Sequence, residues 1–183
     1  MKKNNQKGIT LVALTITIII LIILAGITFN VGKESIRKAN IEELKTNMLL
    51  IETKAKEYVE NASFKLGVNP DANTMYNDAE EYLTGDDKGE NINKENESNQ
   101  KIYAEQINEA KNIGIAEQDI NAGKVYILST DNIKNMGIND VESNNDEGWY
   151  IIVYNIEETT AEIYNTIGIN EKYSLTDIEQ IEL

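Results

Sequence analysis

Clustered carboxylates are the residues of this sequence with the clearest capacity for chemistry. Two acidic clusters occur, Asp86-Asp87-Lys88-Gly89-Glu90 and Asn144-Asn145-Asp146-Glu147. Their hard oxygen atoms suit calcium, but neither cluster has the spacing of an EF-hand loop. The pairs Glu80-Glu81 and Glu157-Glu158 are sequence neighbours in polar surroundings, so nothing predicts the raised pKa of a catalytic acid. We interpret these residues as solvated loops and expect no enzyme and no cofactor, with calcium as the alternative.

The composition excludes several function classes. The 183 residues include no Cys and no His, so a thiolate nucleophile, a cysteine–zinc site and a Ser–His–Asp triad are all absent. The 17 basic and 31 acidic residues give a formal net charge of −14. Because affinity for nucleic acid comes mainly from Lys and Arg meeting phosphates, we expect no direct nucleic-acid binding.

Charge and hydrophobicity are segregated along the chain. Residues 1–8 contain three lysines and no acid, and residues 9–29 contain no charge at all. Residues 33–65 are balanced, with seven basic and six acidic side chains, whereas residues 66–183 have 7 basic and 25 acidic side chains. An uncharged helix of 21 residues would be roughly 31 Å long, about the thickness of a bilayer core. The lysines favour a cytoplasmic N-terminus and an exported remainder.

Several interpretations compete for residues 9–29. A cleaved secretory signal fits the basic start and the small residues Ala25 and Gly26, but the run is long and Leu24 makes a poor small-x-small site. A plain membrane anchor is the simplest alternative. A buried core helix is disfavoured because the segment lacks a polar face.

The junction itself points to a fourth interpretation. Lys7-Gly8-Ile9-Thr10-Leu11-Val12-Ala13-Leu14 places a short basic leader ending in Gly directly before an apolar run that opens with Ile-Thr-Leu. This segment resembles the cleavage signature of type IV pilins and pseudopilins, over about residues 7–29. The resemblance implies a prepilin peptidase that cuts between Gly8 and Ile9 and methylates the new N-terminus at Ile9. It also implies assembly through Thr10, Leu11 and the following helix, with other pilin or pseudopilin subunits, an inner assembly platform and the lipid bilayer as partners.

One position departs from the family pattern. The family usually has Glu at the fifth mature position, where this chain has Ala13. That Glu is thought to neutralise the N-terminal amine of a neighbouring subunit, and an unpaired amine in an apolar filament core costs several kcal/mol. Three arrangements would accommodate Ala13. The subunit is at the filament tip, or another subunit supplies the carboxylate, or Thr10 and backbone carbonyls stabilise the amine instead. We favour a minor subunit.

Beyond the apolar run, an amphipathic helix is predicted. Apolar residues recur at steps of mostly three and four, which gives one apolar stripe among Lys and Glu. We expect this stripe to pack on a C-terminal sheet, with a coiled-coil seam as the alternative. The stripe comprises Ile36, Leu44, Met48, Ile51, Ala55, Tyr58 and Ala62.

The remainder predicts short helices and a small antiparallel sheet. Strands are expected at 125–128, at 149–154 (WYIIVY) and at 163–167, with a hairpin over 157–160. Helices are expected at 75–83, at 102–113, after an N-cap at Thr130-Asp131, and after a capping box at Ser174. Residues 85–100 are predicted to form a mobile loop. The nine Tyr residues and Trp149 fit either a carbohydrate-binding surface or packing in the core, and we favour core packing.

These observations predict an α+β fold, in which a long N-terminal helix, transmembrane and then amphipathic, packs on a small C-terminal antiparallel sheet, as in pilins. The predicted organisation is a leader over residues 1–8, an assembly helix over 9–29, an amphipathic extension over 30–64 and an extracellular head over 65–183. The expected function is that of a pilus or pseudopilus subunit at the cell membrane and surface. The alternative is a membrane-anchored extracellular binding domain that does not polymerise.

Overall fold

The computed structural model describes residues 6–68, 82–85 and 87–181, and of residues 6–13, 23–32 and 68 it describes the backbone alone. Contacts divide the chain into two compact units, Met1–Glu42 and Glu43–Leu183. Helix α1, Gln6–Val68, begins in the first unit and ends in the second. All strands and all other helices of the described residues belong to the second unit, which we call the head.

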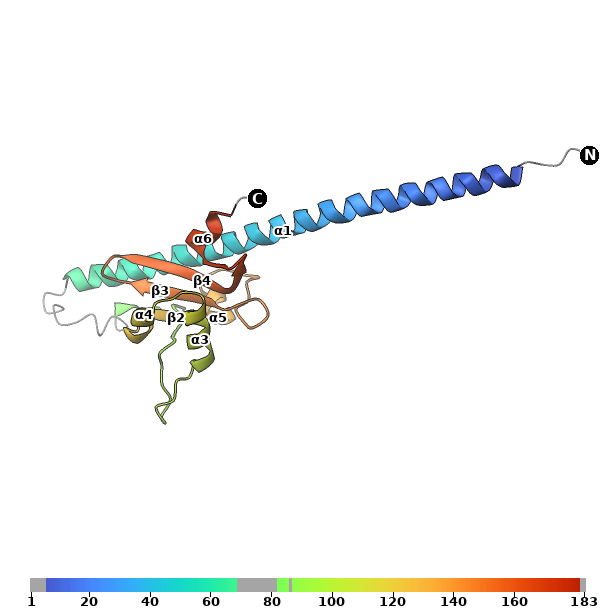
Figure 1. Cartoon of the computed structure of the whole chain (residues 1–183). Coiled ribbons are helices and arrows are strands. Elements are labelled where there is room, and N and C mark those ends of the chain that lie inside the picture. The colour runs from blue at the N-terminus through green and yellow to red at the C-terminus, as the bar shows by residue number, and fades with distance from the viewer. Residues whose placement is uncertain (1–5, 69–81, 86, 182–183) are drawn as a thin grey trace, which may run out of the picture. The chain divides into compact units, whose positions relative to one another are not determined.

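The head contains one antiparallel sheet with the strands in sequence order (Figure 1). The two edge strands are short, with two residues in β1 and three in β5. The central pair is β3 with β4, in register from Tyr150 opposite Asn165 to Asn155 opposite Thr160. The elements that follow α1 are β1 Glu90–Asn91, α3 Ala104–Asn112, α4 Glu117–Asn121, β2 Val125–Leu128, α5 Thr130–Asn135, β3 Tyr150–Asn155, β4 Thr160–Ile169, β5 Lys172–Ser174 and α6 Leu175–Glu179.

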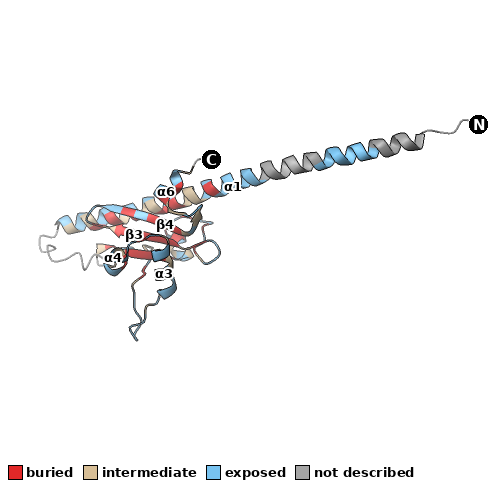
Figure 2. Cartoon of the chain, in the orientation of Figure 1, coloured by how far each residue is buried: buried red, intermediate tan, exposed pale blue. Residues whose placement is uncertain are grey.

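The C-terminal part of α1 covers one face of this sheet. Residues at helical spacing on α1 are fully buried, and they form one core with side chains that alternate along the strands. Figure 2 shows the buried positions in red along this part of α1 and along the strands. The helix contributes Met48, Ile51, Ala55, Val59 and Ala62, and the sheet contributes Tyr126, Leu128, Tyr150, Ile152, Tyr154, Ala161 and Ile163.

The opposite face of the sheet is covered by α3 and α4. A second core joins Ala110 of α3 and Ile120 of α4 to the strand residues that point away from α1. Val125 and Ile127 of β2 and Ile151 of β3 lie on this face. Burial on both faces explains why β2 is apolar at all four positions, without the alternation of a half-exposed strand.

Several local predictions are confirmed and others are shifted. Strands form at 125–128, 150–155 and 160–169, α3 occupies 104–112, and Ser174 caps α6 by accepting a hydrogen bond from the Asp177 amide at 3.2 Å. The cap of α5 is Ser129 instead of Thr130, since Ser129 and Asn132 exchange hydrogen bonds between side chain and backbone. Part of the predicted loop forms β1, because its backbone pairs with β2. The helix predicted at 75–83 lies almost wholly outside the described residues.

The predicted fold class is wrong. We predicted a transmembrane helix continuing into an amphipathic one, packed on a three-stranded sheet as in pilins. Within the part of the chain that the structure describes, no helix has both the length and the apolar character needed to cross a membrane. The sheet has five strands instead of three. The physical reason for the larger sheet is that residues 90–91 pair with β2 and residues 172–174 pair with β4.

The core below α1 generates a stability prediction. Ile51 is fully buried, whereas its neighbour Leu50 is 47% exposed. We expect Ile51→Ala to lower the free energy of unfolding of the head by about 2–5 kcal/mol, because it removes buried methylene groups and leaves a cavity. Urea denaturation followed by circular dichroism measures this loss. Leu50→Ala is the matched control, and an equal loss in both variants would contradict the packing described here.

Candidate functional site

The predicted processing junction lies near the start of α1. The helix begins at Gln6, so the backbone of Gly8, Ile9, Thr10, Leu11 and Ala13 is helical. The side chains of these five residues lie outside the described part of the chain. The structure therefore gives a backbone conformation for the junction and no side-chain geometry.

The acidic clusters do not converge into a metal site. Asp86 lies outside the described residues, and Lys88 donates to the backbone carbonyl of Leu83 at 2.6 Å. In the second cluster the Asn144 side chain accepts hydrogen bonds from the amides of Asp146 and Glu147, which is a turn-forming pattern. Among the residues that the structure describes, no three His, Cys, Asp or Glu side chains gather where they could hold a metal ion.

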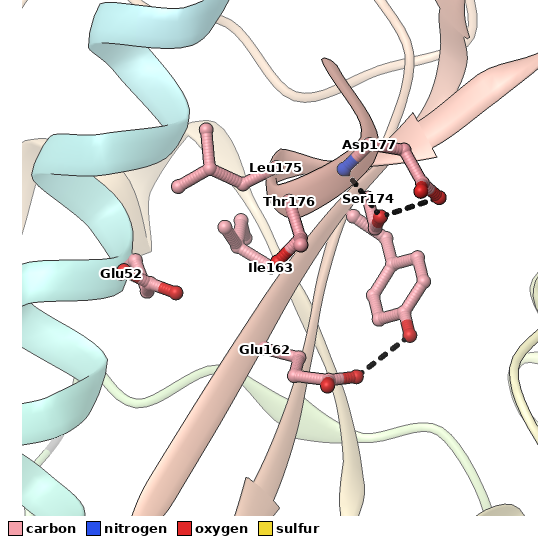
Figure 3. A pocket seen from close by; sticks show the side chains of 8 residues that line it. Glu52, Glu162, Ile163, Ser174, Leu175, Thr176 and Asp177 are labelled. Carbon is pink, nitrogen blue, oxygen red and sulfur yellow. Dashed lines mark hydrogen bonds between the residues drawn. The ribbon is translucent and has the colours of Figure 1, made fainter. Parts of the chain in front are cut away.

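A first hollow of 210 Å³ lies beside β4 and the start of α6. Figure 3 labels its carboxylates, Glu52, Glu162 and Asp177, and draws the hydrogen bonds of the last two. Glu162 accepts from the Tyr164 hydroxyl at 2.8 Å, and Asp177 accepts from the Ser174 hydroxyl at 2.8 Å. Glu52 forms an ion pair with Lys56 at 2.7 Å. Each partner lies within four residues of its carboxylate, so these interactions are local, and they engage the carboxylates that a ligand would need.

A second hollow, of 480 Å³, lies on the side of the head that carries α3. Its volume falls within the roughly 300–1,000 Å³ typical of ligand pockets. It combines two carboxylates of α3, two aromatic side chains and two amides. The lining residues are Glu105, Glu109, Asn112, Ile113, Asn145, Trp149, Thr166, Ile167 and Tyr173. We call this set of residues the α3 pocket.

Hydrogen bonds hold Trp149 in the wall of the α3 pocket. Its indole N–H donates to Asn145 Oδ1 at 2.9 Å, and its backbone amide donates to Thr166 Oγ1 at 2.9 Å. The Thr166 amide donates in return to the Trp149 carbonyl at 3.1 Å. The ring also packs against the second core. An aromatic side chain fixed in this way presents a preformed surface to a ligand.

The adjoining chain turn is tightly constrained. Asn165 is 1% exposed, and its side chain accepts from the amides of Ile167 and Gly168 and donates to the carbonyl of Glu147. The register of β4 with β5 shifts here, as in a β-bulge. Gly148 has φ of +83°, and a Cβ there would lie 2.6 Å from Asn165 Oδ1. The wall of the pocket therefore requires Gly at this position.

The two carboxylates of the α3 pocket have an unfavourable environment. Glu105 and Glu109 are four residues apart on α3, a spacing at which like charges destabilise a helix. Burial, and next the charge of Glu105, raise the pKa of the Glu109 carboxyl above its usual range. Glu109 Oε2 is buried and has no hydrogen-bond partner among the described residues. Neither carboxylate takes part in the ion pairs of the described residues.

Sequence reasoning missed the α3 pocket. It considered Trp149 as part of a carbohydrate surface and favoured core packing, whereas the ring packs on the second core and also lines the pocket. Glu105 and Glu109 were not singled out. The available signal was an acidic pair at i and i+4, but nothing in the sequence places this pair beside Trp149.

Three tyrosines of the head, Tyr150, Tyr154 and Tyr164, do not supply an anionic nucleophile. Burial is the main cause that raises the pKa of Tyr150 to about 12 and the pKa of Tyr154 well above its ordinary value. Burial also raises the pKa of Tyr164, with a further contribution from its hydrogen bond to Glu162. These phenols therefore stay protonated at neutral pH.

Comparisons with known proteins give no family, so the functional assignment rests on the residues of the chain itself. No protein-family model, no curated protein and no solved structure matches this chain.

The pKa of Tyr150 generates a prediction about alkaline stability. A folded-state pKa of about 12, above the unfolded value of about 10, means that the folded state binds the proton more tightly. The stabilising difference is therefore complete below pH 10 and is lost as the pH rises toward 12. At pH 11 this one group should lower the free energy of unfolding by about 1.4 kcal/mol relative to pH 9. Urea denaturation at both pH values measures the loss.

Tyr150→Phe tests the assignment. The phenylalanine keeps the ring but cannot lose a proton, so we expect this variant to lose about 1.4 kcal/mol less between pH 9 and pH 11 than the parent protein. Tyr173→Phe, at a half-buried position of β5, serves as the control. If Tyr150→Phe and the parent protein lose the same stability, Tyr150 does not govern the alkaline transition.

Proposed function

We propose that this chain is an assembly subunit of the type IV pilus or pseudopilus class, and a minor one. In this function a prepilin peptidase cleaves between Gly8 and Ile9 and methylates Ile9. The mature chain then associates with other subunits through its N-terminal segment at an assembly platform. The head is exported and displayed at the cell surface. The observation that carries the proposal is the sequence Lys7-Gly8-Ile9-Thr10-Leu11 at the head of an uncharged run of 21 residues.

Exposed apolar side chains in the first unit support association through this segment. Leu21 is 63% exposed and Ile22 is 66% exposed, in a run where every described residue is exposed. Contiguous exposed apolar surface of this kind marks an interaction site, since water is a poor environment for it. The large apolar residues in question are Leu14, Ile16, Ile18, Ile19, Ile20, Leu21 and Ile22.

The construction of the head also supports the proposal. The head forms a compact unit separate from Met1–Glu42, with its own cores on both faces of the sheet. Its stability therefore does not depend on burying the apolar residues 14–22. Those side chains are left for intermolecular contacts, which is the division of labour that an assembly subunit requires.

Cleavage by a prepilin peptidase is the direct test. Co-expression with such a peptidase should shorten the chain by eight residues and yield Ile9 as an N-methylated terminus, as intact mass and N-terminal sequencing would record. Gly8→Leu should abolish the cut, because the resemblance assigns the cleavage to this Gly. Gly26→Leu is the matched control and should be processed normally.

Two other results would refute the proposal. A cut near Gly26 would identify an ordinary secreted protein. An intact chain that is exported and remains uncut would favour the membrane-anchored binding domain that does not polymerise.

The residue at position 13 generates a second prediction. Ala13 stands where the family pattern has Glu, so the mature amine would lack its usual carboxylate partner in a filament. We expect Ala13→Glu to increase the amount of this chain recovered in sheared filaments, measured by quantitative immunoblotting against the cell-bound pool. Ala13→Gln is the control of similar size without the charge. Equal recovery of all three proteins would show that the missing carboxylate does not limit assembly.

A further inference from the structure

The α3 pocket has the chemistry of a site for an organic cation. Two carboxylates on successive turns of α3 lie in one hollow with the rings of Trp149 and Tyr173. An aromatic face attracts a cation through its quadrupole, and a neighbouring carboxylate adds charge-assisted hydrogen bonds. Among the residues that the structure describes, the lining of the hollow includes no lysine or arginine. Of the two carboxylates that line the hollow, Glu105 is exposed and Glu109 is half-buried.

A guanidinium group fits this lining better than the other cations do. The guanidinium is planar and presents five N–H donors, so it can stack on an indole while it donates to two carboxylates. An ammonium group is a strongly hydrated point charge and gains less from stacking. A divalent metal requires converging oxygen ligands, and the described residues contain no such group of three.

The chain contains one arginine, and it is exposed. Arg37 lies on α1 within Lys33-Glu34-Ser35-Ile36-Arg37-Lys38, where three side chains are basic and one is acidic. Lys38 pairs with Glu34 at 3.6 Å, whereas Arg37 forms none of the ion pairs found among the described residues. Residues 66–183 have a formal charge of −18, from 7 basic and 25 acidic residues. This charge attracts a basic segment of another copy.

We propose that the α3 pocket binds the guanidinium group of Arg37 from a second copy of this chain. The contact rests on the assembly function proposed above and gives it a specific subunit-to-subunit bond. In this bond the guanidinium stacks on Trp149 and donates to Glu105 and Glu109. It thereby neutralises the like-charged pair on α3.

A peptide titration tests the recognition without any filament. The probe is the acetylated and amidated peptide of residues 33–38, added to the full chain in detergent. The chain is given the substitution Arg37→Ala so that other copies do not occupy the pocket. Trp149 is the only tryptophan, so its fluorescence reports on the pocket alone. We expect a saturable change, and about tenfold weaker binding for Glu105→Gln and for Glu109→Gln.

Matched controls make the titration decisive. Glu97→Gln removes the same charge from an exposed turn and should bind the peptide as the parent does. The same peptide with citrulline in place of Arg37 has the shape but not the charge, and should bind at least tenfold more weakly. Equal binding of the citrulline peptide, or an equal loss in Glu97→Gln, overturns the proposal. A saturable response to methyl glucoside but not to the peptide overturns it as well and makes the pocket a carbohydrate site.

Cross-linking between copies tests the partner. The chain has no cysteine, so a bismaleimide bridge between a Lys38→Cys copy and an Asn108→Cys copy of different mass is unambiguous, and it leaves Arg37, Glu105 and Glu109 intact. We expect the mixed dimer to form, and at least tenfold less of it when the first copy also carries Arg37→Ala or when Glu97→Cys replaces Asn108→Cys. Equal yields overturn the proposal. The outcome is independent of peptidase cleavage, so a failure of this contact and a failure of the proposed processing are distinguishable.

Discussion

Burial of one helical stripe beneath the sheet is the constraint on which the head depends. Five strands, of which two have only two or three residues, cannot persist in water with an apolar face uncovered. Helix α1 meets this requirement with residues spaced so that Met48, Ile51 and Ala55 fall on one side. Ala55 and Ala62 belong to the same core as Tyr126 and Tyr154, whose rings meet edge to face at 5.1 Å. Helix and sheet therefore stabilise each other.

The second face of the sheet allows the head to carry a pocket. Since α1 already covers one side, α3 and α4 are held on the other side by a smaller core around Val125, Ile127 and Ile151. This packing brings α3 beside the start of β3, so that carboxylates and an aromatic ring from distant parts of the sequence line one hollow. The tight turn at Gly148 and Asn165 fixes the wall. The proposed binding site thus lies on the face of the sheet that has the smaller core.

The local features that the sequence predicted correctly are those with strong periodicity. The stripe from Met48 to Ala62 and the strands at 125–128 and 150–155 follow from helical spacing and from β-branched runs. Ile36 was included in the stripe but is 63% exposed. The strands β1 and β5 were missed because segments so short are strands only by virtue of their partners. The fold class failed for the same reason, since the number of strands and the covered faces depend on tertiary pairing.

One candidate site could be predicted from the sequence and the other could not. The junction at Gly8 is a local motif and needs no fold to be proposed. The α3 pocket cannot be predicted without knowing how α3 packs against the sheet. Glu109 and Trp149 are forty residues apart in the sequence and come together only in the tertiary structure. The i, i+4 pair of Glu105 and Glu109 was visible in sequence, but an acidic pair on a helix is by itself an ordinary solvated surface.

The short edge strands have a consequence for copies held at high local concentration. An exposed edge offers unpaired backbone amides and carbonyls to another sheet, and long flat edges template continuous β-structure. Here one edge ends after two residues and the other after three, next to a bulge that interrupts the register. Neither edge strand is by itself long enough to template a continuous sheet with a neighbouring head. Heads held close together would therefore meet through side chains more readily than through the backbone of these two strands.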